Sequence, residues 1–407
     1  MSPRSRNALF AAISMIGSVV LVLLLAEVAV RIWVPGGEIQ PDPAMIRSMV
    51  PNFRREVAFV EPHYRPGQNQ SAPPQAEGPL GSTSTNNLGF RMLADVKDKR
   101  PDERRILLLG DSYLAAMEVD ARDSFFEIVS RRLDEETRGR WKIINLGISS
   151  GSPLQYLMQL HHWGERLQPD LVIVFLGAND SPDDVRTGER YGIVTDENGV
   201  PIHPAKQFSL ALIRASHLAR YFAQFTLNRI PDLFVLLSPP RATKENVPQN
   251  TSRRNIDSWI ELACEASEAS KQAFLEGTGR NLRMLKDEAS ELGAGFAVVI
   301  VHYPFYFPDE PFYETRWPQD FLEALKTHGC LQSEGRPFED FARAFLRENG
   351  IEFASTYDRF LEAKRRSPEQ KLWHFYDYHY NPVGHRLAAE ELHGLVKRLI
   401  ASRPGEK

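Results

Sequence analysis

The sequence has few cysteines and no excess charge of either sign. Its 407 residues include only two cysteines, Cys264 and Cys330, and 49 basic residues stand against 53 acidic ones. This balance removes the electrostatic basis for binding nucleic acid or for a polybasic patch on a membrane surface. Two cysteines can form one disulfide in an oxidising compartment. Two buried free thiols are an equal alternative, because sequence spacing does not show that the cysteines meet.

The sequence also lacks the patterns of a metal site, a phosphate-binding loop and an internal repeat. It contains no HExxH run and no Cys/His cluster at ligand spacing. The stretch GTGRNL, residues 277–282, is too isolated to indicate a phosphate loop. We therefore expect no metal and no cofactor.

A long apolar run is present at the N-terminus. Residues 8–26 carry no charge, and as a helix at ~1.5 Å per residue they reach about 28 Å, enough to cross a bilayer core. Arg4 and Arg6 precede the run, which predicts a cytoplasmic N-terminus and a periplasmic remainder. A cleaved signal peptide is the alternative, but the run is long for one and lacks a clean small-x-small cleavage site. We expect a single-pass membrane anchor within residues 1–34.

The remainder divides into a stem and one domain. Residues 35–100 are rich in Pro, Gly, Ser, Asn and Gln without a persistent period, which predicts a stem. From 101 to 403, apolar runs alternate with helical patterns, which predicts an α/β domain with a parallel sheet covered on both faces. The expected strands are 106–109, 142–146, 171–176, 295–301 and 351–354. The expected helices are 124–136, 153–167, 319–327, 338–348 and 382–400, with a helical insertion over about 181–293.

Polar residues follow these strands where they end. Ser112 follows the first strand within LGDSY, and Asn179 follows the third within LGAND. Asp377 and His379 lie in YDYHYNPVGH, before the last expected helix. Because the carboxyl ends of parallel strands share one edge of the sheet, we expect these side chains to converge there.

These residues have the chemistry of an acyl-transfer site. A serine hydroxyl becomes a good nucleophile when a base removes its proton, and His379 can be that base for Ser112. Asp377 can hold the imidazole tautomer and balance its charge. The Ser112 N–H and the Asn179 amide are candidate donors to the oxyanion. The structural alternative for Ser112 is a helix cap, and we expect His385, on the last helix, to be structural.

The segments LGDSY, NLGISSGSP, LGAND and YDYHYNPVGH resemble, in order, the four signature blocks of the SGNH/GDSL hydrolase superfamily. The resemblance covers about residues 104–402 and implies a three-layer, flavodoxin-like α/β fold that acts on esters. It implies a catalytic set of Ser112, Asp377 and His379, and an oxyanion hole formed by Ser112, Asn179 and either Ser150 or Gly151.

Two features depart from the family pattern. Many members place the acid three residues before the histidine, where this chain has Tyr376. The DYHYN spacing instead resembles the branch that includes alginate-type O-acetyltransferases. An ungapped match puts Ser150 at the usual oxyanion glycine, with Gly151 next, and both remain candidates because a backbone N–H does not require glycine. The lead-in TNNLGFRML also resembles that of membrane-anchored members.

Together these features predict a membrane-anchored, periplasmic serine esterase that acts on small acyl esters or acylated carbohydrates. One alternative is an O-acyltransferase that acetylates an envelope polysaccharide. Another is a non-catalytic glycan-binding domain that has kept the fold. The aromatic stretch 302–317 is expected to wall the acyl or sugar pocket, and a packed loop is the alternative.

Overall fold

The computed structural model divides the chain into two units, and the second contains the sheet. One unit comprises residues 1–58 and 196–241, and the other comprises residues 59–195 and 242–407. The structure describes residues 18, 22–26, 28, 69–70, 83–149, 151–191, 194–195, 201–202, 249–307, 319–330, 336–374 and 378–403.

A five-stranded parallel sheet forms the centre of the second unit, in the order β4-β3-β5-β8-β9. Its strands are β3 (Arg104–Leu109), β4 (Trp141–Asn145), β5 (Leu171–Leu176), β8 (Gly295–Ile300) and β9 (Glu352–Ser355). Every residue of β5 is buried, because helices cover both faces of a parallel sheet. β3 has β4 on one side and β5 on the other, so the strand order reverses there. Open α/β sheets bind ligands at this position.

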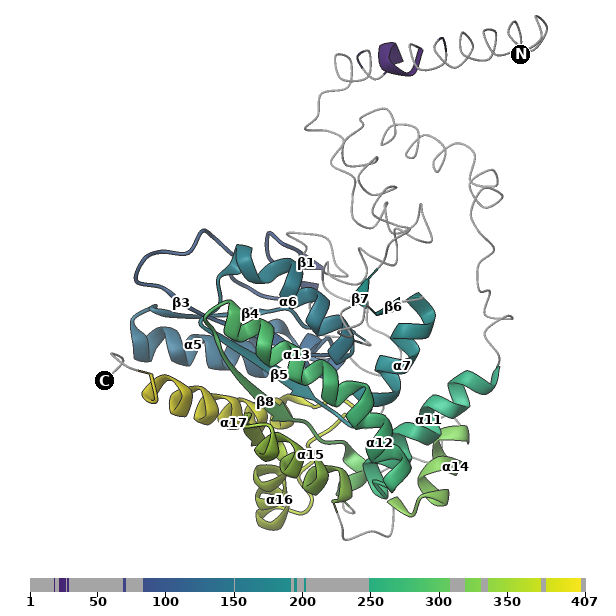
Figure 1. The fold of residues 1–407 in the computed structure, drawn as a ribbon. Helices are drawn as coiled ribbons and strands as arrows, with labels where there is room; N and C mark the ends of the chain where they lie inside the picture. The colour runs from purple at the N-terminus through teal and green to yellow at the C-terminus, as the bar shows by residue number, and fades with distance from the viewer. Residues whose placement is uncertain are drawn as a thin grey trace, which may run out of the picture. The chain divides into compact units, whose positions relative to one another are not determined.

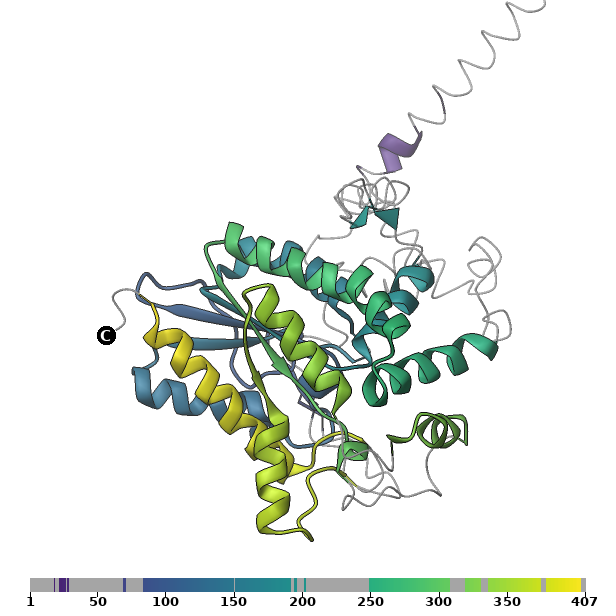
Figure 2. The same cartoon turned by 60° about the horizontal axis from the view of Figure 1, so that its bottom comes forward.

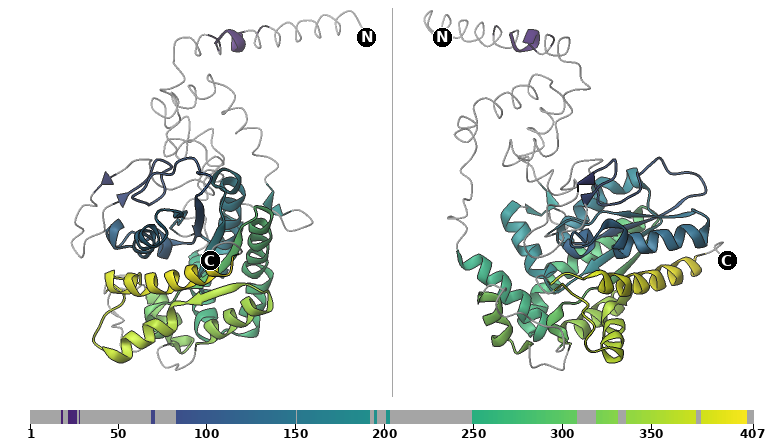
Figure 3. Two further views of the ribbon diagram at one scale, coloured as in Figure 1. Left: turned by 90° about the vertical axis from the view of Figure 1, so that its left-hand side faces the viewer. Right: turned by 180° about the vertical axis from the view of Figure 1, so that it is seen from behind.

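Helices cover the two faces of the sheet (Figures 1 and 2). On one face α6 (Pro153–Leu167) packs against α13 (Thr278–Glu291), and on the other α5 (Phe125–Thr137) packs against α17 (Pro382–Ala401). The view from behind shows α5 and α17 side by side (Figure 3). The predicted α/β fold with a parallel sheet is therefore confirmed.

The remaining elements are shorter or lie around the edges of the sheet. The helices are α4 (Ser112–Ala115), η1 (Ala121–Asp123), α7 (Asp180–Tyr191), α11 (Gln249–Cys264), α12 (Glu268–Glu276), η2 (Pro304–Tyr306), α14 (Gln319–Thr327), α15 (Pro337–Glu348) and α16 (Thr356–Arg366). Four two-residue strands form two further pairs: β1 (Asn69–Gln70) with β2 (Thr83–Ser84), and β6 (Val194–Thr195) with β7 (Pro201–Ile202). The expected insertion thus contains α7, α11, α12 and α13, while its residues 203–248 lie outside the described residues.

The expected anchor lies mostly outside the described residues. Residues 18 and 22–26 of that run are described and helical, and the side chains from Val22 to Leu25 are exposed. In the part of the chain that the structure describes, no helix combines the length and the apolar character needed to cross a membrane. The end of the expected stem packs on the domain, since Phe90 and Met92 are buried in its core.

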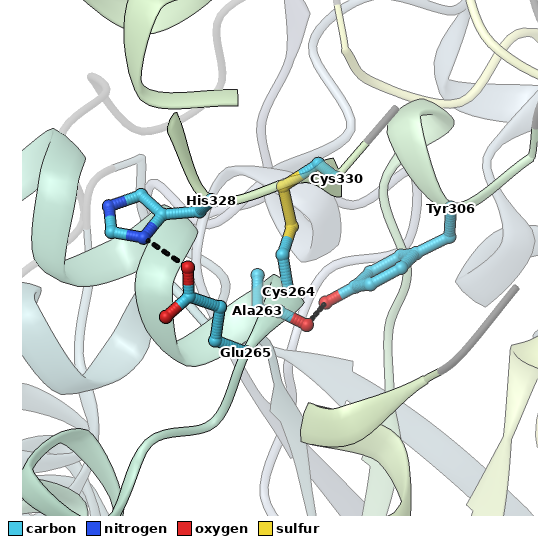
Figure 4. Close-up of a disulfide and its surroundings, with 6 residues drawn as sticks. All are labelled: Ala263, Cys264, Glu265, Tyr306, His328 and Cys330. Atoms are coloured by element: carbon cyan, nitrogen blue, oxygen red, sulfur yellow. Dashed lines mark hydrogen bonds and ion pairs between the residues drawn. A yellow bond between two sulfur atoms is a disulfide. The ribbon is translucent and has the colours of Figure 1, made fainter. Parts of the chain in front are cut away.

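A disulfide joins Cys264, the last residue of α11, to Cys330, just after α14 (Figure 4). The two Cα atoms are 5.2 Å apart. Beside the bond, the Tyr306 hydroxyl donates to the Ala263 carbonyl at 3.1 Å, which ties the end of α11 to η2. The disulfide therefore fixes the end of α11 against the residues that follow α14, and the hydrogen bond fixes it against η2, which follows β8.

Breaking this disulfide should lower the free energy of unfolding by about 2–4 kcal/mol. The bond closes a sequence separation of 66 residues, and such a cross-link stabilises mainly by restricting the unfolded chain. Denaturant unfolding of the chain with and without reductant measures the loss. Cys264→Ala combined with Cys330→Ala is the control and should no longer respond to reductant. Alkylation of both thiols in the unfolded state shows that the disulfide has been reduced. An unfolding midpoint that stays unchanged under these reducing conditions would contradict the prediction.

Candidate active site

Ser112 lies where β3 ends, at the first position of the one-turn helix α4. Asp111 caps this helix, since its Oδ1 accepts the Tyr113 N–H at 3.0 Å. The hydroxyl of Ser112 is therefore not the cap. It lies 2.8 Å from Nε2 of His379, so the structure brings together two of the predicted site residues.

The segment that carries His379 is held by short-range hydrogen bonds. Tyr380 and Trp373 form an antiparallel bridge, and the His374 N–H donates to the His379 carbonyl at 3.0 Å. Asn381 caps α17 through its Oδ1, and its Nδ2 donates to the Trp373 carbonyl at 3.1 Å. The asparagine of DYHYN thus starts the last helix and fixes the loop before it.

Tyr113, the residue after Ser112, joins the two segments of the site. Its hydroxyl donates to the Tyr378 carbonyl at 2.5 Å, and its ring centroid lies 5.1 Å from that of the His379 imidazole. Trp259 of α11 adds a further ring to this aromatic cluster, with centroid distances of 5.8 Å to Tyr378 and 5.0 Å to Tyr303. Burial raises the pKa of Tyr113 well above its usual range, so this phenol is neutral and acts as a hydrogen-bond donor.

A carboxylate lies on the other side of the imidazole from Ser112. Oε1 of Glu118 is 3.3 Å from Nδ1 of His379, and the two side chains are each 9% exposed. Sequence reasoning did not single out this residue. The available signal is a lone acid within the apolar segment that follows the Ser112 turn, residues 114–119.

Asn179 follows β5 and lies beside the Ser112 corner. Its Nδ2 donates to Asp111 Oδ2 at 2.9 Å and to Asp183 Oδ2 at 3.1 Å, and its Oδ1 accepts the Tyr303 hydroxyl. Both amide hydrogens are thus directed at carboxylates. Donation to an oxyanion requires one of these two hydrogen bonds to be released.

The carboxyl groups around Asn179 have perturbed acidity. Burial raises the pKa of Asp111, partly offset by its hydrogen bonds from Asn179 and Tyr113. Burial raises the pKa of Asp183 to about 7, against the opposing effect of Arg186. The pKa of both acceptors of the Asn179 amide is therefore raised by burial. Asp180 accepts the Gly177 N–H at 2.7 Å and holds the turn that carries Asn179.

The second predicted oxyanion segment is described in part. Ser150 lies outside the described residues. The Gly151 N–H donates to the Ile148 carbonyl at 3.1 Å, so in this structure it closes a turn. A Cβ on Gly147 would lie 2.8 Å from the backbone N of Ala115, which shows how closely this loop approaches α4.

The other predicted residues are placed as follows. Asp377 and residues 308–317 of the aromatic stretch lie outside the described residues, and the acid role of Asp377 stays a prediction. His385 is buried, its Nδ1 lies 3.3 Å from the Phe125 N at the start of α5, and burial lowers its pKa well below the usual range. It is therefore a neutral, structural histidine. Within the described ranges, no group of three or more His, Cys, Asp or Glu is arranged to hold a metal ion.

Comparison with known proteins gives one family. The model of the GDSL-like lipase/acylhydrolase family matches residues 108–387. A search of curated proteins found no match.

Solved structures similar to this chain include three esterases. The esterase EstA from Pseudoalteromonas sp. is 14% identical, with 74% of this chain and 100% of that chain covered and a TM-score of 0.34. The acetyl xylan esterase AlAXEase is 12% identical, with 72% and 99% covered and a TM-score of 0.35. A catalytic mutant of the acetylxylan esterase Axe2 from Geobacillus stearothermophilus is 13% identical, with 72% and 94% covered and a TM-score of 0.33.

Proposed function

Because the chain belongs to the GDSL-like lipase/acylhydrolase family and is an ester-hydrolysing enzyme of the SGNH type, we propose that it cleaves small-acyl carboxylic esters through an acyl-Ser112 intermediate. The observation that carries the proposal is the 2.8 Å contact between Ser112 Oγ and His379 Nε2. This contact lies at the edge of the sheet where parallel α/β folds bind ligands.

In this reaction His379 takes the proton of the Ser112 hydroxyl as its Oγ bonds to the ester carbonyl carbon. The proton then passes from Nε2 to the leaving alkoxide. In the second half of the reaction, water gives a proton to His379 and bonds to the acyl carbon, and Ser112 leaves with the proton from Nε2, which releases the carboxylic acid. The backbone N–H of Ser112 lies at the start of α4, where the first N–H groups have no partner within the helix, and is available to the oxyanion. Asn179 and either Ser150 or Gly151 are the further proposed donors.

A small acyl group is supported by the side chains around the nucleophile. Tyr113 and Tyr303 are buried next to the Ser112 corner, and Trp259 packs between Tyr303 and Tyr378. A cluster of large rings beside the nucleophile favours a small acyl group over a long one. The partly buried rings of Trp259 and Tyr378 offer an apolar wall to an acylated carbohydrate.

A fluorophosphonate probe tests the proposal directly. The probe phosphonylates a serine that a neighbouring base activates, so we expect one modification per chain, on the peptide that contains Ser112. His379→Ala should slow the labelling strongly. Labelling that maps to another serine, or that proceeds equally fast in His379→Ala, would reject the proposed mechanism.

The proposal includes a single-pass anchor over residues 8–26 and a periplasmic domain. The exposed apolar side chains from Val22 to Leu25 support the anchor, and the disulfide between Cys264 and Cys330 supports an oxidising compartment. A C-terminal reporter that works only in the periplasm should be active, and one that works only in the cytoplasm should be silent. Fusions that lack residues 1–34 are the control and should reverse this pattern. The reversed pattern in the full chain would overturn the assignment.

Acyl transfer to a glycan is the second candidate, motivated by the DYHYN spacing and the aromatic cluster. It differs from hydrolysis only in what attacks acyl-Ser112. A bound sugar hydroxyl competes with water at ~55 M when positioning gives it a large effective molarity, which reaches about 10⁵ M or more for well-oriented groups. Incubation with an acetyl donor and envelope glycans distinguishes the two reactions. Acetylated sugar that is formed by the wild type and not by Ser112→Ala would establish transfer. Release of free acetate at a rate that no glycan changes would indicate hydrolysis alone.

A further inference from the structure

The imidazole of His379 lies between a hydroxyl and a carboxylate. Its Nε2 is 2.8 Å from Ser112 Oγ, and its Nδ1 is 3.3 Å from Glu118 Oε1. A histidine that removes a proton through one ring nitrogen needs its other nitrogen protonated and held by an acceptor. From this geometry we propose that Glu118 is the positioning carboxylate that holds His379 and stabilises its protonated form. The inference rests on the proposed acyl-Ser112 chemistry.

A turn after α4 places Glu118 beside His379. Helix α4 ends after one turn because Ala116 adopts the left-handed conformation, with φ 49° and ψ 46°. Glu118 follows two residues later, so the same short corner supplies both Ser112 and the carboxylate. The side chain of Glu118 is buried together with His379, which strengthens their electrostatic interaction because the site is shielded from water.

A buried arginine braces this corner on both sides of Glu118. Arg91 is 1% exposed, and its guanidinium donates to the carbonyls of Ala115 at 3.0 Å, of Ala116 and of Val119 at 2.5 Å. Arg91 is itself held, since its carbonyl accepts the Asn145 Nδ2–H at 3.0 Å from the end of β4. A charged group that orients another side chain needs such a fixed backbone, because small displacements weaken its hydrogen bond.

The proton balance of the step is simple. As the Ser112 Oγ bonds to the ester carbonyl carbon, its proton moves to Nε2, and the imidazole becomes a cation with protons on both nitrogens. The Nδ1–H donates to the carboxylate of Glu118, which stays ionised throughout. The Nε2 proton then moves to the leaving alkoxide as the C–O bond breaks, and the ring returns to its neutral form.

Other titratable groups also face His379 in the described structure. Asp111 and His385 interact with it electrostatically, and the rings of Tyr113 and Tyr378 pack against it at centroid distances of 5.1 Å and 4.5 Å. Asp111 follows β3 and faces Asn179, His385 is neutral, and the Tyr113 phenol is neutral. Glu118, in contrast, contacts Nδ1 directly.

The test uses the full chain purified in detergent and a small activated ester. Glu118→Gln keeps the size of the side chain and removes its charge. We expect kcat to fall about 10²–10⁴-fold with little change in KM, as when the acid of such a site becomes an amide. The acidic limb of the profile of kcat/KM against pH should move about one unit or more to lower pH, because the imidazolium loses its counter-charge. Glu118→Asp retains the charge and should keep the limb near its wild-type position.

Two control variants distinguish a positioning role of Glu118 from an effect on folding and from the alternative that Asp377 is the acid. Glu127→Gln removes another buried carboxylate, which accepts the Leu93 N–H at 2.7 Å, and should lower the melting temperature without moving the limb. Asp377→Asn should cause a smaller loss and a smaller shift than Glu118→Gln. A limb that moves with Asp377→Asn and not with Glu118→Gln would overturn the inference, as would Glu118→Gln activity within about threefold of wild type.

The result also separates this inference from the proposed function. If wild type is labelled by fluorophosphonate at Ser112 and Glu118→Gln behaves as wild type, the acyl-Ser112 chemistry stands and the role of Glu118 is rejected. If Ser112 is not labelled and Ser112→Ala remains active, the proposed function itself fails.

Discussion

Ser112→Ala should lower kcat/KM for a p-nitrophenyl ester by about 10³–10⁶-fold and leave the fold intact. The loss is large because the variant has no oxygen at the position 2.8 Å from His379 Nε2. The fold should tolerate the change because Asp111, and not Ser112, caps α4, and because alanine is a good helix residue. Steady-state kinetics and thermal unfolding of the same preparations measure the two parts of the prediction.

Ser181→Ala is the matched control for this variant. Ser181 is a buried serine near the carboxyl edge of the sheet, in the first turn of α7. Its replacement should leave kcat/KM within a few-fold of wild type. If Ser112→Ala retained most of its activity, or if both variants lost it equally, the assignment of Ser112 as nucleophile would be wrong.

His379→Ala should cause a loss of similar size, and the double variant with Ser112→Ala should lose little more. Residues that act as one unit in a proton transfer give effects that do not add, because removing either member already disables the step. The buried side chain of His379 packs against the rings of Tyr113 and Tyr378, so the alanine variant also leaves a cavity. His379→Gln fills more of this space and separates the loss of the base from the loss of packing.

A second histidine provides the control for these variants. The side chain of His161 is 77% exposed and lies on α6, where Nδ1 is 3.1 Å from Glu288 Oε1. His161→Ala should leave kinetics and stability close to wild type. Losses in Ser112→Ala and His379→Ala that multiply fully in the double variant would show that the two residues act independently, which contradicts a shared proton transfer.

The sequence by itself predicted the sheet and most of its helices. The boundaries expected for residues 153–167, 171–176 and 319–327 agree with α6, β5 and α14. The reason is local. A parallel strand buried on both faces has a continuous apolar run, and a helix on the sheet has an apolar stripe, so each pattern is present in the segment itself. Helix α16 was not predicted, because polar and charged residues dominate its sequence and only a few of its side chains are buried.

The convergence of Ser112 and His379 was also predictable, because parallel strands end at a common edge and the motifs follow those strands. Family membership followed from the same motifs. The acid role of Asp377 and the oxyanion role of Ser150 remain predictions, since both residues lie outside the described residues. The placement of the membrane anchor likewise remains a prediction from hydropathy and charge.

Only the tertiary structure decided which distant side chains meet. The pairing of Cys264 with Cys330 depends on how α11 and α14 pack. The contact of Glu118 with His379 depends on a left-handed residue at 116 and on the buried Arg91, which no local period encodes. The contact of Asn179 with Asp111 arises because the ends of β5 and β3 lie side by side, whereas Asp183 contacts Asn179 locally, from the first turn of α7. Hydrophobic periodicity specifies which face of an element is buried, whereas the partners of a polar side chain depend on the three-dimensional packing of elements far apart in the chain.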